Sequence, residues 1–90
     1  MGTVIKRGGR KQAFSPGKIR KAVEKTAREA GLSASRVREL SKEVAEPIIA
    51  LYKNKRVKSV VLRRSILGRL SRRAKSVAAA WIRYEKKKRR

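Results

Sequence analysis

The sequence predicts an α+β fold that is mainly α, in which an N-terminal β-hairpin packs on a bundle of about four helices. Strand-like segments flank a Gly-Gly pair near the N-terminus, and apolar residues at helical spacing occupy most of the remaining chain. Hydrophobic residues make up 40% of the 90 residues, which suffices for one small core. We therefore expect a single domain over residues 1–85 and a basic C-terminal tail over residues 86–90.

The hairpin is predicted from the segments TVIKR and KQAF, which lie on either side of Gly8 and Gly9. Two glycines can both adopt positive φ, as the turns that connect paired strands require. The loop is expected to have two residues or slightly more. Because an isolated hairpin is only marginally stable, it must pack on the helices.

The first helix has clear start and stop signals. Ser15 is expected as the N-cap, and Pro16 as the first helical residue, where its missing N–H costs nothing. Ile19, Val23 and Ala27 follow helical spacing. Gly31 is typical of the left-handed residue that ends a helix.

A second helix is expected to begin near Ser33 or Ser35, with Pro47 causing a kink or an early end. Residues 53–58, KNKRVK, are expected to be a basic connection. Ser59 is predicted to cap a third helix, and a last helix should run from about Ser76.

The composition argues against an enzyme. The sequence has no Cys, no His and no Asp, so the commonest general base, catalytic triads and nearly all zinc sites are excluded. No continuous apolar span or signal-peptide core is present, which predicts a cytoplasmic protein without a membrane partner. The absence of Asp and Cys and the scarcity of Asn and Gln are typical of thermophiles.

The net charge of +22 far exceeds what solubility needs and indicates a polyanionic partner. The charge is unevenly distributed. Residues 1–23 carry seven basic residues and no acidic one, residues 24–46 carry five of each, and residues 47–90 carry sixteen basic residues against Glu85. If the two basic ends meet in the fold, they form one positive face.

The densest basic cluster lies on the expected third helix, where no Glu between residues 47 and 84 can pair with it. Arginine suits bidentate contacts to phosphate. We expect nucleic-acid contacts from this cluster, from the connection before it and from both ends of the chain: Arg63, Arg64, Arg69, Arg72, Arg73, Lys75, Lys53, Lys55, Arg56, Arg10, Lys11, Lys86, Lys87, Lys88, Arg89 and Arg90.

Aromatic residues are too few for a base-stacking surface. Trp81 and Tyr84 are spaced as helix residues that face inward, and we expect them to pack against the hairpin. This favours recognition of backbone and shape over the reading of bases.

Several motifs occur in an informative order. A V-x-K-R-x-G segment at Val4–Gly9 is followed by Phe14, by Lys18-Ile19 at a helix start, and by AWIRY at residues 80–84. This order resembles the ATP-cone domain family, whose last helix carries a pattern like Ala-Tyr-Val-Arg-Phe. The resemblance covers roughly residues 3–86.

The resemblance implies a hairpin on four helices, with ATP or dATP held between them; no other cofactor is expected. It implies that Lys6, Arg7 and Lys18 meet the phosphates and that Val4 lies near the base. In the family this domain regulates ribonucleotide reductases and forms part of their transcriptional repressor.

The sequence departs from the family where acidic residues are usual. Gly8 stands where the family usually has Asp in the hairpin turn, Gln12 replaces an acidic residue before Phe14, and Ser15 replaces an Asp. Ser15 can still cap the helix, so the departures leave the expected fold intact.

Two functions are therefore expected. The charge favours a non-enzymatic nucleic-acid-binding protein that contacts the phosphate backbone, with ribosomal RNA and ribosomal proteins as the preferred partners and chromosomal DNA next. The alternative is an ATP- or dATP-binding regulatory module of ribonucleotide reductase or of its transcriptional control. The alternative predicts saturable binding that prefers adenine, whereas a polyanion surface predicts weak, salt-labile binding without that preference.

Overall fold

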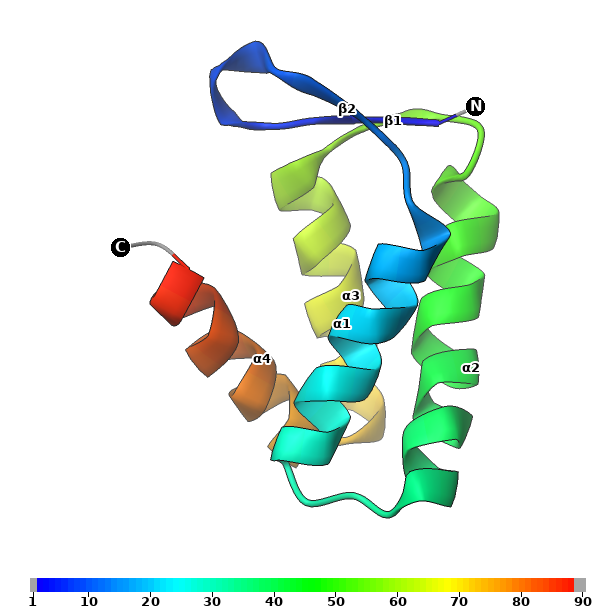
Figure 1. Ribbon diagram of the computed structural model, residues 1–90, viewed down its shortest axis with the longest axis vertical. Coiled ribbons are helices and arrows are strands. Elements are labelled where there is room, and N and C mark those ends of the chain that lie inside the picture. The colour runs from blue at the N-terminus through cyan, green and yellow to red at the C-terminus, as the bar shows by residue number, and fades with distance from the viewer. Residues whose placement is uncertain (1, 89–90) are drawn as a thin grey trace.

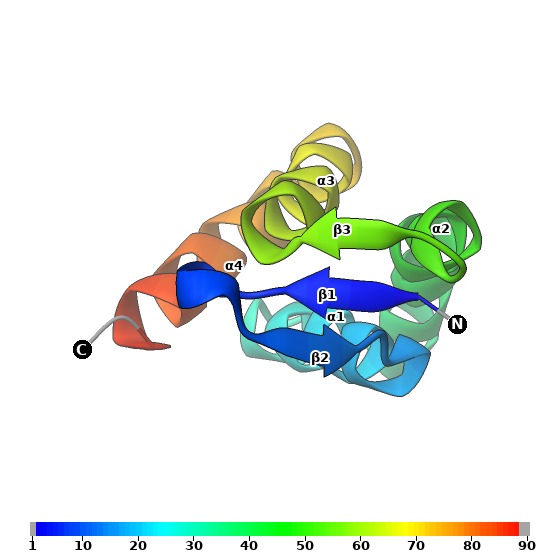
Figure 2. The same cartoon turned by 90° about the horizontal axis from the view of Figure 1, so that it is seen from above.

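The computed structural model describes residues 2–88 and confirms the predicted class (Figure 1). Four helices form the body of the molecule: α1 (Pro16–Glu29), α2 (Ala34–Tyr52), α3 (Ser59–Arg73) and α4 (Lys75–Lys88). Three short strands, β1 (Thr3–Ile5), β2 (Lys11–Ala13) and β3 (Arg56–Lys58), lie across one end of the helices (Figure 2).

The sheet has one strand more than the hairpin supplies. The strand order is β2-β1-β3, with β1 antiparallel to β2 and parallel to β3. The expectation that residues 53–58 form only a connection is therefore wrong for Arg56–Lys58. Strand β3 forms because Val57 is buried and pairs with Val4 of β1. On its other side Val4 pairs with Gln12 of β2.

The ends of α1 and α2 agree largely with the sequence signals. The Ser15 and Ser33 hydroxyls accept from the backbone N–H groups three residues on, and Gly31 has a φ of 88°. The expected early end at Pro47 is wrong, because α2 continues to Tyr52. Ile48 and Ile49 are buried just beyond the proline, and their packing holds the last turns of the helix.

The boundaries of α3 and α4 differ slightly from those predicted. Ser59 is the first residue of α3, and Lys58 occupies the N-cap position without a side-chain cap. The last helix begins at Lys75 and extends to Lys88, so it includes three residues of the expected tail. Arg89 and Arg90 lie outside the described residues.

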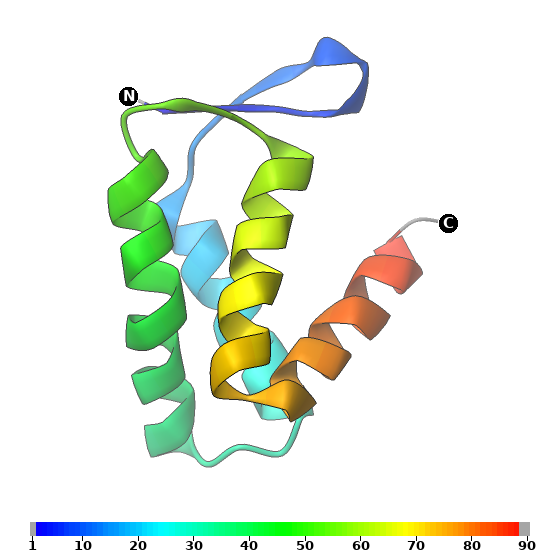
Figure 3. The same ribbon diagram turned by 180° about the vertical axis from the view of Figure 1, so that it is seen from behind.

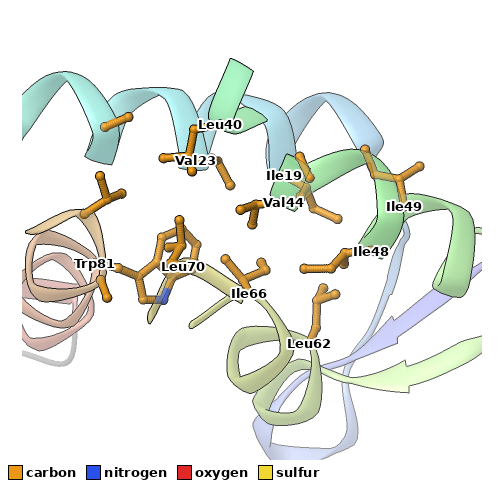
Figure 4. Packing of buried hydrophobic residues seen from close by; sticks show 14 of the residues in the cluster. Ile19, Val23, Leu40, Val44, Ile48, Ile49, Leu62, Ile66, Leu70 and Trp81 are labelled. Carbon is orange, nitrogen blue, oxygen red and sulfur yellow. The ribbon is translucent and has the colours of Figure 1, made fainter. Parts of the chain in front are cut away.

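All four helices contribute to one core, seen from close by in Figure 4, while Figure 3 shows the ribbon from the α3 side. Val23, Leu40 and Leu70 are completely buried. The prediction that Trp81 packs inward is confirmed, because it belongs to the core cluster, but Figure 4 shows it on the side of the core away from the strands, and not against the hairpin. No helix in the described part of the chain is long and apolar enough to cross a membrane.

The start of β1 passes very close to the loop that comes after α2. A Cβ added to Gly2 would lie 2.5 Å from the carbonyl oxygen of Lys53, and the Thr3 N–H donates to the Lys55 carbonyl at 3.0 Å. Because the obstacle is backbone, Gly2→Ala must displace the strand, at a cost of about 1–3 kcal/mol. Thermal unfolding should show a Tm lower by roughly 4 °C or more.

Gly17 provides the matched control for this prediction. It lies in the first turn of α1 with normal φ, and a Cβ there would meet nothing within 4 Å. Gly17→Ala should leave the Tm unchanged or raise it slightly. Equal Tm values for the two variants would show that β1 does not approach the loop closely.

A two-pronged ion pair joins α1 to α2. The Arg20 Nε and Nη2 atoms donate to the Glu46 carboxylate at 2.7 and 2.9 Å. The hydrogen bond from Arg20 holds the pKa of Glu46 below its usual value. A lowered folded-state pKa means that the pair stabilises the fold above the unfolded pKa, and that this stabilisation is lost as the pH falls through the folded pKa.

Glu46→Gln should therefore lower the Tm slightly at neutral pH, because exposed ion pairs contribute little. The Tm difference from the unchanged protein should shrink as the pH falls below about 4.3, the ordinary glutamate pKa. Melting curves across this range would test it, with Glu29→Gln as the control, since Glu29 has no ion pair among the described residues. A Tm difference that stays constant with pH would contradict the prediction.

Candidate nucleotide site and basic surfaces

The inner face of the hairpin is defined by β1. Val4 packs against the hydrophobic core, so its side chain faces the helices. Side chains alternate along an extended chain, and Lys6 has extended backbone angles (φ −85°, ψ 170°). Lys6 therefore follows Val4 on the same face, and its side chain is exposed at the end of the strand. Gln12, paired with Val4, shares this face without adding negative charge.

The hairpin turn is longer than a two-residue loop. Five residues, 6–10, connect the strands and include a short 3₁₀ turn. Gly8 and Gly9 both have a φ of 83°, as expected from the Gly-Gly pair. The Lys6 N–H donates to the Arg10 carbonyl at 2.7 Å, and Gly9 N–H donates to the Lys6 carbonyl at 3.0 Å. Arg7 opens this turn, and the position of its side chain is outside what the structure describes.

Lys18 lies in the first turn of α1 and is exposed. Its backbone N–H donates to the Ser15 hydroxyl at 3.4 Å, which caps the helix. No acidic residue is present in this turn, so the positive end of the helix dipole is not neutralised locally. An anion beneath the hairpin would meet this helix end and the Lys18 ammonium together.

The fold relates Lys6 to Lys18 through β2. Lys6 lies just beyond the Ile5–Lys11 pair, while β2 leads through Phe14 directly into α1. The two lysines thus belong to opposite ends of the hairpin strands, separated by three paired positions, or roughly 10 Å of strand. They lie toward the two ends of the inner face that carries Val4.

The outer face of the sheet is basic. Lys11 and Lys58 lie on either side of Ile5, and Arg56 lies next to Thr3. All three basic side chains are exposed. The parallel pairing of β1 with β3 therefore brings the basic N-terminal segment beside the basic residues 53–58. The other basic residues expected near this surface, namely Arg10, Lys53 and Lys55, are exposed in the adjoining loops.

The basic residues of α3 do not form one cluster. Arg64, Arg69 and Arg72 line a shallow groove between α2 and α3, whereas Arg63 and Arg73 are not among its lining residues. Arg73 donates to Glu43 of α2 at 3.2 Å, so a carboxylate from an earlier helix neutralises it. Of the remaining expected residues, Lys75, Lys86 and Lys87 are exposed on α4. The side chain of Lys88 is not described.

Most carboxylates are held by nearby side chains. Glu24, Glu39, Glu43 and Glu46 form ion pairs with arginines, and Glu85 accepts from the Trp81 indole N–H. No carboxylate in the described part of the chain forms an ion pair with Arg64, Arg69 or Arg72. No group of three acidic residues within residues 2–88 could hold a metal ion.

None of the four aromatic side chains is freely exposed. Phe14 and Trp81 are buried, and Tyr52 and Tyr84 are half-buried. Tyr84 lies 6.2 Å from Trp81 between ring centroids, and the Lys25 ammonium lies 5.5 Å from its ring. Stacking of bases on exposed rings is therefore not a property of this surface.

The groove also contains residues that the sequence reasoning missed, above all Ser65 and Gly68. Gly68 was visible as a glycine inside a helix, which costs about 1 kcal/mol relative to Ala. The sequence alone could not show that Ser65 lines a groove, because the groove forms only where α2 packs beside α3.

The fold and the hairpin face define a small helical domain whose basic β-hairpin covers the N-terminal end of a helix. The ATP cone domain family matches residues 2–90, and the chain belongs to this family. The family is an ATP-binding regulatory module, as in ribonucleotide reductase, and not a catalytic domain. No curated protein matches the chain. The resemblance read from the hairpin, Phe14 and the last helix is thereby confirmed.

Proposed function

We propose that this chain binds ATP or dATP beneath its hairpin and acts as a nucleotide-responsive regulatory module. Its output is control of a ribonucleotide reductase or of the transcription of one. Membership of the ATP cone family is the observation that carries the proposal. Lys6 on the inner face, the turn at Gly8 and Gly9, and the uncompensated start of α1 supply groups suited to phosphates.

In this proposal Lys6, Arg7 and Lys18 bind the phosphates and Val4 contacts the base. Lys6 and Lys18 are exposed and have no carboxylate partner among the described residues, so their charges are available to a ligand. Val4 offers an apolar side chain on the same face as Lys6. Residues 1–23 contain no carboxylate side chain that would oppose a triphosphate.

Calorimetric titration of the full chain with ATP, dATP, GTP and inorganic triphosphate tests this proposal. Saturable one-to-one binding that is tighter for the adenine nucleotides is expected, with affinity in the micromolar range, or about −8 kcal/mol. Binding that ranks only by ligand charge would mean that the basic surface attracts polyanions without an adenine site.

The charge distribution supports a second function, binding of nucleic acid through the phosphate backbone. The observation behind it is that residues 47–90 contain sixteen basic residues and only one acidic residue, Glu85. Structured RNA, with ribosomal RNA and ribosomal proteins first, is the preferred target, and chromosomal DNA is the next. Retention of RNA from the cell's own lysate at moderate salt, tested by nuclease digestion and sequencing, distinguishes these targets.

A further inference from the structure

A groove of about 280 Å³ lies between α2 and α3, the two helices that run side by side in Figure 3. Its wall on α2 is apolar, formed by Ile48 and Leu51, and its wall on α3 is basic. It is separate from the inner face of the hairpin, which lies over the start of α1. We propose that this groove binds the sugar-phosphate backbone of double-helical RNA, an inference that rests on the second proposed function.

The charges in the groove are arranged in a line along α3. Arg64, Gly68 and Arg72 are four residues apart, so they succeed one another along the same side of the helix, with Arg69 next to them. The stripe from residue 64 to residue 72 spans about 12 Å at a rise of 1.5 Å per residue. Three guanidinium groups over this length present forked donors to successive phosphates of one strand.

These arginines are available to a ligand. The ion pairs of the described residues involve Arg20, Arg28, Arg36 and Arg73, and none involves a groove arginine. Glu43 forms its ion pair with Arg73, which lies outside the groove. No carboxylate is among the residues that line the groove. Positive charge concentrated in this way is compensated most directly by phosphates, with release of their counterions.

Gly68 gives independent support for close approach of a ligand. Gly68 lies far from both ends of α3, is exposed to solvent and does not have a positive φ. A Cβ at this position would meet nothing within 4 Å. The fold therefore has no need of a glycine here, although glycine weakens a helix by about 1 kcal/mol relative to Ala. A missing side chain in the middle of a basic stripe lets a backbone approach the helix surface closely.

The neutral groups in the groove favour RNA over DNA. Ser65 lies between the arginines and forms a hydrogen bond of 3.1 Å with the Tyr52 hydroxyl. Hydroxyl groups beside phosphate-binding arginines can donate to or accept from ribose 2′-OH groups, which DNA lacks. Since no aromatic side chain of the described residues is exposed, the recognition is of a double helix rather than of unpaired bases.

The test uses the full chain and a labelled RNA duplex of about 20 base pairs, longer than the ~16 that one double-strand-binding domain covers. Fluorescence anisotropy is measured over a range of salt concentrations. Replacing Arg64, Arg69 and Arg72 together by Ala should reduce the slope of log K against log salt by about 2–3, since each lost phosphate contact removes about 1. Replacing Lys21, Arg38 and Lys42 together by Ala is the matched control, because these three side chains are exposed, form no ion pair among the described residues and lie outside the groove.

A pair of uncharged variants separates steric access from charge. Gly68→Ala should raise the Tm and Gly68→Leu should leave the protein folded, but Gly68→Leu should weaken RNA binding roughly tenfold or more, or about 1.4 kcal/mol. Unchanged RNA affinity in Gly68→Leu, or a groove variant that loses no more affinity than the control variant at Lys21, Arg38 and Lys42, would overturn the proposed groove site while RNA binding elsewhere on the chain stands. No RNA binding by the unchanged protein would overturn both, and equal affinity for a DNA duplex of the same sequence would overturn the choice of RNA.

Discussion

Replacing both Lys6 and Lys18 by Ala is expected to weaken ATP binding by roughly 100-fold or more. Each lysine removed is one charge-assisted contact to phosphate, about 1.5–3 kcal/mol, and every 1.4 kcal/mol is tenfold in Kd. Both side chains are exposed, one at the end of β1 and one in the first turn of α1, so the fold does not depend on them. Calorimetric titration of the double variant with ATP measures the effect.

Arg38→Ala combined with Lys42→Ala is the matched control for this loss. Both side chains are exposed on α2, and the change removes the same two positive charges. It should alter ATP affinity only through the weak, screened field of the whole protein. If the two double variants lose affinity equally, the hairpin and α1 do not form the nucleotide site.

Trp81→Ala is expected to have the largest effect on stability. The Trp81 side chain is 4% exposed, belongs to the same core as Leu70 and donates its indole N–H to Glu85. Removing a buried aromatic side chain costs about 3–5 kcal/mol, a large share of the 5–15 kcal/mol of a typical domain. The Tm should fall by roughly 12 °C or more, measured by far-UV circular dichroism.

The neighbouring residue of the same helix gives the control. Ile82 is 42% exposed, so Ile82→Ala should change the free energy of unfolding by less than about 0.5 kcal/mol. Similar losses in the two variants would mean that Trp81 is not part of the core.

Local sequence signals predicted most of the fold. Ser15 with Pro16, the Gly8-Gly9 pair and Gly31 each require a particular backbone conformation, and each adopts it. Strand β3 was missed because its three residues pair with β1, some fifty positions earlier, and only Val57 is buried. The early end expected at Pro47 does not occur, because packing of the residues beyond it outweighs the hydrogen bond that a proline removes.

The sites were less predictable than the fold. The position of Lys6 on the inner face can be inferred from strand alternation once Val4 is known to pack on the core. By contrast, the division of the α3 arginines depends on contacts between helices. Glu43 reaches Arg73 from α2, and the groove exists only because α2 and α3 lie side by side. Counting charges along one segment of the sequence could show neither the Glu43–Arg73 ion pair nor the groove.

The central claim is that an adenine nucleotide binds between the hairpin and the start of α1. The most direct measurement is the titration of ¹⁵N-labelled protein with ATP, monitored through its backbone amide resonances at a salt concentration of about 0.15 M, which screens surface charge. We predict that ATP causes saturating shifts confined to residues 3–19, which form the hairpin and the start of α1. GTP should shift the same resonances less than ATP does. Shifts spread over α3, equal for ATP, GTP and inorganic triphosphate, would contradict the claim.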